Sequence, residues 1–233
     1  MISTVKLQSS LPHAGEFPVL PCSTPFLACR SIHPSAHNCL KRSIDILGAL
    51  VGLSVTALLL PVIAIAMHLT DPGPLFYNQI RCGLNGRPFR IWKFRSMIVD
   101  ADQKKHLVKN KATGHIFKNK NDPRITKLGR FLRKTSLDEF PQFWNVLKGD
   151  MSLVGTRPPT PDEVKYYNPY HWQRLQVKPG ITGEWQVNGR SCVTNFNDIV
   201  QLDLAYQKKW SIAYDLQLIL RTVGVLFTKK GAY

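Results

Sequence analysis

The sequence predicts an α+β fold in which a membrane-embedded, re-entrant helical hairpin precedes a small cytoplasmic domain with a β-hairpin and amphipathic interfacial helices. Three observations predict this class. An uncharged apolar run covers residues 46–67, two strand-like segments surround the Asn85-Gly86 turn, and 31 Lys and Arg face only 15 Asp and Glu. The net charge of +16 indicates an anionic partner: an acidic membrane surface, a phosphorylated ligand or nucleic acid.

Residues 1–40 are predicted to be a disordered leader, because they are rich in Pro, Ser and His and show no hydrophobic periodicity. The segment has no early apolar core, so we do not expect a signal peptide. His33, His37 and Cys39 could together bind a metal ion, but a polar leader that happens to carry histidines explains them more simply. The five cysteines form no C-x-x-C pair, and we expect reduced thiols.

Residues 41–70 are predicted to form the membrane hairpin. The 22 uncharged residues at 46–67 are long enough to cross a hydrocarbon core of about 30 Å. Pro61 lies inside the run, where it must kink or break a helix, and Lys and Arg flank both ends, which is typical of cytoplasmic flanks. We therefore expect a re-entrant segment at 44–69, bent near Pro61, with both ends cytoplasmic. A straight span and a buried core helix are the alternatives.

The cytoplasmic part begins with a turn at residues 71–74, which is followed by a predicted β-hairpin. The segments "LFYNQIRC" and "PFRIWKFRSM" read as strands around "GLNG", in which Asn85-Gly86 is a strong hairpin signal. A phosphate-cradling loop could also use Gly83 and Gly86, but the turn explains both glycines more simply. The polar segment at 99–124 is expected to be helix plus loop.

Two later segments predict amphipathic helices. In "ITKLGRFLRK", Ile125, Leu128 and Leu132 share one helical face and the cations lie largely on the other. The segment at 210–230 has apolar residues at helical spacing and aromatic residues near its start. Each helix could lie flat on an anionic membrane. Ordinary packing, with a solvated basic face in the first case, explains them equally well.

Two adjacent acids, Asp138 and Glu139, follow this basic segment. Pro141 locates the helix that carries them, because proline is tolerated in a first turn whose N–H groups have no helical partner. Asp138 is then at or just before the helix start, and Gly149 ends the helix. Ser136 could form a capping box with Glu139, but that would place Pro141 inside the helix.

Two interpretations of Asp138 stay open at this point. Aspartate is a favoured N-cap, which would make its role structural. A carboxylate at a helix N-terminus beside Arg133 also stays ionised at neutral pH, which suits a nucleophile or a metal ligand. The residues alone favour the cap.

The continuation of the chain changes this balance. The motifs "KFRSM", "TSLDEFPQFWNVLKGDMSLVGTRP" and "KPGITGEWQVNGR" follow the broken apolar run in this order. Together they resemble the bacterial sugar transferase family, from about Lys41 to Tyr233. Its members are monotopic phosphoglycosyl transferases that start polysaccharide repeat units on a polyprenyl phosphate. One departure is Thr156, where the family usually has proline, and we expect a looser loop around Arg157.

The resemblance implies a function for the cytoplasmic domain, residues 71–233. A sugar 1-phosphate would pass from a UDP-sugar to undecaprenyl phosphate through a covalent intermediate on Asp138, which starts exopolysaccharide, O-antigen or capsule synthesis. Glu139 would complete the acidic dyad, and Mg²⁺ would neutralise phosphate charge with Asp138 as its protein ligand. Nucleic acid would not be a partner. The site would lie at the cytoplasmic face of the bacterial plasma membrane.

The resemblance also implies phosphate-binding cations. Arg157 and Arg190 match family arginines that hold the nucleotide phosphates, a task for which the guanidinium fork is suited. Three further cations are weaker assignments, since they could bind phosphate or support the fold and lipid headgroups: Lys93, Arg95 and Arg133.

Two other function classes are alternatives. A membrane-tethered basic binding module explains the charge and the apolar run, but it does not explain the acids at Asp138 and Glu139. A magnesium-dependent phosphohydrolase could use the same acids and would release free sugar phosphate. No motif in the sequence identifies the sugar.

Overall fold

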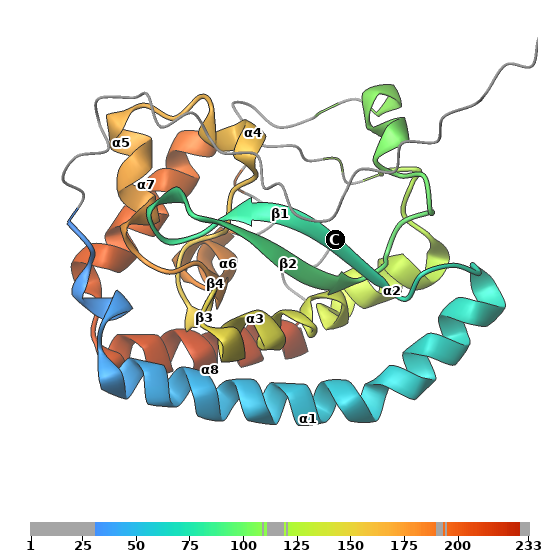
Figure 1. Ribbon diagram of the computed structural model, residues 1–233, viewed down its shortest axis with the longest axis horizontal. Helices are drawn as coiled ribbons and strands as arrows, with labels where there is room; N and C mark the ends of the chain where they lie inside the picture. The colour runs from blue at the N-terminus through green and yellow to red at the C-terminus, as the bar shows by residue number, and fades with distance from the viewer. Residues whose placement is uncertain are drawn as a thin grey trace, which may run out of the picture.

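A computed structural model of the protein describes residues 31–108, 110, 119, 121–189, 193 and 195–228. Helix α1 lies along one edge of the molecule, α3 and α8 lie next to it, and the β1–β2 hairpin lies beyond them (Figure 1). This mixture of helices and short sheets agrees with the predicted α+β class. The elements are α1 (Cys39–Thr70), β1 (Phe76–Cys82), β2 (Pro88–Phe94), α2 (Lys127–Thr135), α3 (Gln142–Lys148), β3 (Ser152–Val154), α4 (Pro161–Val164), α5 (Pro169–Trp172), β4 (Gly180–Thr182), α6 (Glu184–Gly189), α7 (Phe196–Lys209) and α8 (Ile212–Thr228).

The apolar run forms one helix in place of the two legs of a hairpin. Helix α1 has 32 residues, or about 48 Å at 1.5 Å per residue, and it continues through Pro61 with a bend toward its C-terminal end (Figure 1). Proline removes one helical hydrogen bond, and the bonds of the neighbouring turns hold the helix together while it kinks. The hydroxyls of Ser54 and Thr56 donate to the Leu50 and Gly52 carbonyls one turn earlier.

Helix α1 has one face against the protein and one apolar face exposed. Gly48 and Gly52 allow the close approach, because a Cβ atom at these positions would lie 2.5 Å from the Leu153 side chain and 2.4 Å from the Phe143 ring. Within the described part of the chain, α1 is the one helix long and apolar enough to cross a membrane. Its exposed face carries Leu47, Leu50, Val51, Leu58, Val62, Ile65 and Leu69.

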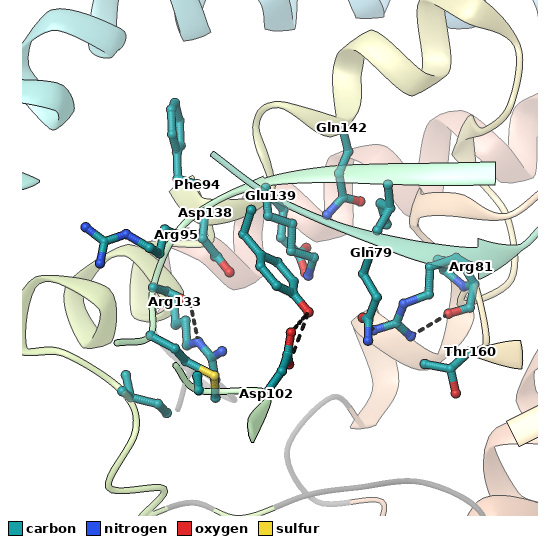
Figure 2. A pocket seen from close by; sticks show the side chains of 18 of the residues that line it. Gln79, Arg81, Phe94, Arg95, Asp102, Arg133, Asp138, Glu139, Gln142 and Thr160 are labelled. Carbon is teal, nitrogen blue, oxygen red and sulfur yellow. Dashed lines mark hydrogen bonds and ion pairs between the residues drawn. The ribbon is translucent and has the colours of Figure 1, made fainter. Parts of the chain in front are cut away.

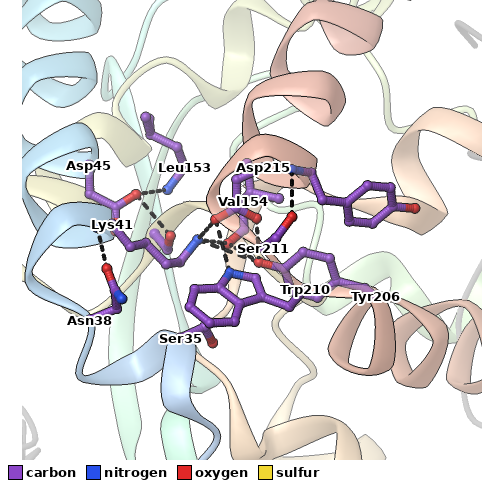
Figure 3. A network of polar contacts seen from close by, with 12 residues as sticks. Ser35, Asn38, Lys41, Asp45, Leu153, Val154, Tyr206, Trp210, Ser211 and Asp215 are labelled. Atoms are coloured by element: carbon purple, nitrogen blue, oxygen red, sulfur yellow. Dashed lines mark hydrogen bonds and ion pairs between the residues drawn. The ribbon is translucent and has the colours of Figure 1, made fainter.

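A buried polar network fixes the start of α1 to the C-terminal half of the domain (Figure 3). Lys41 Nζ donates to Asp215 Oδ2 of α8 at 2.6 Å and to the Val154 carbonyl of β3 at 3.0 Å. One turn later, Asp45 Oδ1 accepts a hydrogen bond of 2.9 Å from the Leu153 backbone N–H. These contacts hold α1, β3 and α8 together at one end of the molecule.

The predicted β-hairpin is confirmed. Strands β1 and β2 pair antiparallel, with Phe76 opposite Phe94 and Cys82 opposite Pro88. Asn85 and Gly86 have φ values of 53° and 76°, the left-handed conformation that an Asn-Gly turn adopts readily. The predicted helices at 125–134 and 210–230 are also confirmed, as α2 and α8.

The predicted disordered leader extends too far toward the C-terminus. Residues 1–30 lie outside the described part of the chain, but residues 31–38 fold against the domain. The His33 backbone N–H donates to the Gln176 carbonyl at 3.0 Å, Ser35 is buried, and Asn38 caps α1 through its side chain. Proline, serine and asparagine are common in leaders, but here they form a turn and a helix cap.

Candidate active site

One face of the β-hairpin forms a wall of an open cavity with a volume of about 940 Å³. Because side chains alternate along a strand, Tyr77, Gln79 and Arg81 of β1 lie on the same face as Lys93 of β2. The opposite walls come from the corner between α2 and α3 and from the segment after β3. Figure 2 shows Asp138 and Arg133 toward one end of this cavity and Arg81 with Thr160 toward the other.

Asp138 lies in a short 3-10 turn (Leu137–Glu139) between α2 and α3, so the predicted N-cap is wrong. Helix α3 begins at Gln142, and Pro141 occupies its N-cap position. The corner is made by Ser136, which ends α2 in the left-handed region with φ of 57° and forms no side-chain cap hydrogen bond. This conformation turns the chain before a helix can start at Asp138, and it directs the acid into the cavity, where it is 5% exposed.

Arg133 provides positive charge next to Asp138. Its Nε donates to Ser96 Oγ at 2.8 Å, which fixes the guanidinium on the cavity wall. Burial lowers the pKa of Arg133, and the carboxylate of Asp138 opposes this shift. The attraction acts in both directions, so Arg133 offsets part of the cost of burying the Asp138 carboxylate.

Lys93 and Glu139 form an ion pair of 3.0 Å between Lys93 Nζ and Glu139 Oε1. Both side chains are about a quarter exposed and line the cavity. The pair therefore places one cation and one carboxylate on the cavity wall next to Asp138. Six of the seven predicted site residues line this one cavity: Lys93, Arg95, Arg133, Asp138, Glu139 and Arg157.

Arg95 has a different environment from the other predicted phosphate ligands. Its Nε donates to the Pro74 carbonyl at 2.7 Å and its Nη1 to Asp71 Oδ2 at 2.7 Å, while Nη2 contacts the Asp71 carbonyl. In Figure 2 its guanidinium points away from Asp138. These contacts secure the end of α1 against β2, which favours the fold-supporting alternative for Arg95.

Arg157 lies on the cavity wall after β3, and Arg190 lies outside the described residues. Arg157 Nη1 and Nη2 donate to the two carboxylate oxygens of Glu163 at 2.9 and 3.3 Å. Burial would raise the pKa of Glu163, but Arg157 holds it below its usual value. Thr156 is 1% exposed and donates to the Arg174 carbonyl at 3.1 Å. These contacts anchor the loop around Arg157 at Thr156.

Sequence reasoning missed several cavity residues, above all those of β1. Tyr77 donates to Asp102 at 3.2 Å, and burial followed by the Asp102 charge raises the pKa of Tyr77 to about 12. Gln79 and Arg81 continue the same face. The available signal was a strand with polar side chains at every second position. This pattern did not identify the cavity, because an exposed sheet face shows the same pattern.

The carboxylate oxygens near Asp138 suit a metal ion that is bound jointly by the protein and by phosphates of a bound ligand. Among the described residues, no three His, Cys, Asp or Glu side chains are placed to hold a metal ion. Magnesium is usually bound by one or two carboxylates together with substrate phosphates, and Asp138 beside Glu139 provides this donor type.

At the predicted leader, His33 was a candidate metal ligand. Both of its ring nitrogens lie within hydrogen-bond distance of protein oxygens, on Ser35 and Gln207.

Comparison with known proteins identifies several relatives. The model of the bacterial sugar transferase family matches residues 36–229. The galactosyl transferase CpsE of Streptococcus agalactiae is 52% identical over 199 residues, which cover 84% of this chain and 44% of that protein. The UDP-glucose:undecaprenyl-phosphate glucose-1-phosphate transferase of Escherichia coli is 39% identical over 235 residues, 97% of this chain and 47% of that protein.

The chain spans about half the length of these two relatives, and nearly the full length of a third. The sugar transferase EpsL of Bacillus subtilis, whose function is uncharacterized, is 38% identical over 192 residues, which cover 82% of this chain and 89% of that protein. Because the family model covers most of the sequence and the relatives exceed 30% identity, the chain belongs to the bacterial sugar transferase family.

Proposed function

We propose that the protein transfers a sugar 1-phosphate from a UDP-sugar to undecaprenyl phosphate at the cytoplasmic face of the bacterial plasma membrane, and so starts an exopolysaccharide, O-antigen or capsule repeat unit. One observation carries the proposal: the buried Asp138 carboxylate lies beside Arg133 and the Lys93–Glu139 pair, in a cavity of a domain packed on a long apolar helix. The names of the relatives from S. agalactiae and E. coli support it.

The reaction proceeds in two displacements at phosphorus. An Asp138 carboxylate oxygen attacks the sugar-linked phosphorus, the bond from that phosphorus to the bridging oxygen breaks, and UMP leaves with the electron pair. A phosphate oxygen of undecaprenyl phosphate then attacks the same phosphorus and releases the Asp138 carboxylate. Arg133 and Lys93 face the transferred phosphate, and Arg157 holds the nucleotide side. A buried, cation-lined site favours the developing charge.

Asp138, with Glu139 next to it, would hold Mg²⁺ together with the substrate phosphates. When bound, the ion supplies charge neutralisation at the phosphates. The protein's own contribution is to place Asp138 beside the positive charge of Arg133 and to position Glu139 through Lys93.

The test is a transfer assay with a panel of UDP-sugars. Purified membranes containing the protein are incubated with undecaprenyl phosphate, Mg²⁺ and one UDP-sugar at a time, including UDP-glucose and UDP-galactose. We expect UMP release that depends on the lipid phosphate and yields a lipid-linked product. Release of water-soluble sugar phosphate without lipid would indicate a phosphohydrolase. No UMP release with any donor, while the protein stays on the membrane, would indicate a binding module.

For α1 we propose a re-entrant topology in which the bend at Pro61 returns both ends to the cytoplasmic side. The exposed apolar face of α1 and the contacts of both its ends with one domain support this proposal. Pro61→Ala restores the missing hydrogen bond and favours a straight helix, which at about 48 Å exceeds the hydrocarbon core of about 30 Å.

The measurement is the labelling of single cysteines in intact cells with an impermeant reagent. A cysteine in the leader and one after Asp71 should both be protected in the unaltered helix, and Pro61→Ala should expose the leader in part of the population. Ala57→Ser, one turn earlier in α1, keeps the proline and serves as the control. Labelling of the leader without any change at Pro61 would refute the re-entrant topology.

A further inference from the structure

Arg81 stands at the far end of the cavity wall from the Lys93–Glu139 pair. In the hairpin register Lys93 lies opposite Tyr77, and Arg81 is four residues further along β1, or roughly 14 Å at 3.4 Å per residue. The end of β1 that carries Arg81 lies near α4, on the side of the hairpin away from α1 (Figure 1). A ligand bound along this wall therefore has one end at Asp138 and the other near Arg81.

Neutral oxygen acceptors hold the Arg81 guanidinium in place. Its Nη1 donates to the Pro158 carbonyl at 3.0 Å and its Nη2 to Gln79 Oε1 at 2.8 Å (Figure 2). Within the described part of the chain, Arg81 forms no ion pair. Its position is thus fixed while its charge is not neutralised by a contacting carboxylate.

The surrounding charges leave an excess of one positive charge. Arg157 is paired with Glu163, and behind it Arg174 is paired with Asp203. Burial, followed by repulsion from Arg157, lowers the pKa of Arg81 to about 10, so Arg81 remains charged at neutral pH. A guanidinium removed from water without an ionic partner is costly to the fold, and an anionic ligand would offset that cost.

We infer that Arg81 and Arg157 together bind the phosphate of the leaving nucleoside monophosphate, in a subsite separate from the one at Asp138 where the transferred phosphate lies. The inference rests on the proposed function. Arg157 contacts a carboxylate and Arg81 does not, so the two guanidinium groups together retain positive charge for a ligand, and their fixed orientation suits phosphate oxygens. The acceptor lipid also carries phosphate, but the Arg81 end of the cavity lies away from α1, so the nucleotide is the favoured source.

The experiment measures the binding of UMP to the whole protein in detergent by isothermal titration calorimetry. Arg81→Gln should weaken the affinity for UMP roughly tenfold or more, because a charged hydrogen bond is lost. Gln79→Ala keeps both charges and only releases the Arg81 side chain, so a loss of about threefold is expected. Arg90→Gln is the matched control, since Arg90 is exposed on the opposite face of the same hairpin and its loss should leave UMP affinity unchanged.

Kinetics separate the two sources of phosphate. In the transfer assay, Arg81→Gln should leave the KM for undecaprenyl phosphate within about twofold of wild type while weakening product inhibition by UMP. Unchanged UMP affinity in Arg81→Gln would overturn the inference, and so would a raised KM for the lipid with intact UMP binding. If Arg81→Gln does not fold, Gln79→Ala with wild-type UMP affinity overturns it. A wild-type protein that does not bind UMP at all would instead defeat the proposed function.

Discussion

Asp138→Asn is expected to lower sugar-phosphate transfer by a factor of roughly 10³ or more, because the side-chain amide cannot form the acyl phosphate. Asparagine has nearly the same shape, so the turn at Leu137–Glu139 should persist and the protein should remain folded and membrane-bound. The measurement is UMP release from purified membranes with the UDP-sugar found active in the panel. Brief incubation of the wild type with a phosphorus-labelled donor, followed by peptide mapping, should place the label on Asp138.

The matched control is Asp198→Asn, which removes one exposed carboxylate at the start of α7 and lies outside the cavity. It should leave turnover within about twofold of wild type, as expected for a surface change. Turnover of Asp138→Asn near that of the control would end the covalent mechanism on Asp138, and a label on a different residue would show that another residue is the nucleophile. Loss of folding in Asp138→Asn would appear as a lowered Tm, which is measured on the same preparation.

Arg174→Met is expected to destabilise the protein by about 3–5 kcal/mol, because it leaves the Asp203 carboxylate buried without its partner. The Arg174 side chain is fully buried; its Nε donates to Asp203 Oδ2 at 2.8 Å and its Nη1 to Tyr167 Oη at 2.8 Å. Its Nη2 also donates to the Arg157 carbonyl at 3.1 Å, so the substitution should disturb the Arg157 end of the cavity as well. For a chain of this size the expected decrease in Tm is roughly 6–20 °C.

Two further variants test whether the unpaired buried charge causes the loss of stability. Arg174→Met combined with Asp203→Leu removes both charges, and most of the stability should return, since an apolar pair of similar volume replaces a buried ion pair at little cost. Arg90→Met, at an exposed position, should change Tm by no more than about 2 °C. A Tm of Arg174→Met equal to that of Arg90→Met would show that the buried pair contributes nothing to stability.

Local patterns predicted the elements whose signals are contained in a few neighbouring residues. The Asn85-Gly86 turn fixes β1 and β2, and the periodic apolar residues of α2 and α8 reveal those helices. For the same reason the sequence singled out Asp138, Glu139 and Lys93, which stand in recognisable motifs and lie in one cavity of the structure.

The features that were missed depend on contacts between distant segments. Strands β3 and β4 have three residues each and pair in parallel across the intervening chain, so neither shows a period of its own. The turn at Ser136 is set by a left-handed conformation that serine rarely adopts, and sequence favoured a cap at Asp138 instead. The contacts that hold Arg81 in place form only when the chain folds. From sequence alone, an arginine on a strand is interpreted as an ordinary solvated cation.

The contact between Lys41 and Asp215 joins residues that are 174 positions apart. At roughly 5–20 residues per second, synthesis of the intervening chain takes about 9–35 s. During that interval α1 is synthesised in full, but α8, whose Asp215 pairs with Lys41, does not yet exist. We therefore expect the apolar part of α1 to enter the bilayer first, with Lys41 and Asp45 still in contact with water or lipid headgroups. The docking that completes the domain becomes possible only after Asp215 has been synthesised, and a nascent chain stalled before Asp215 should remain accessible to protease at the base of α1.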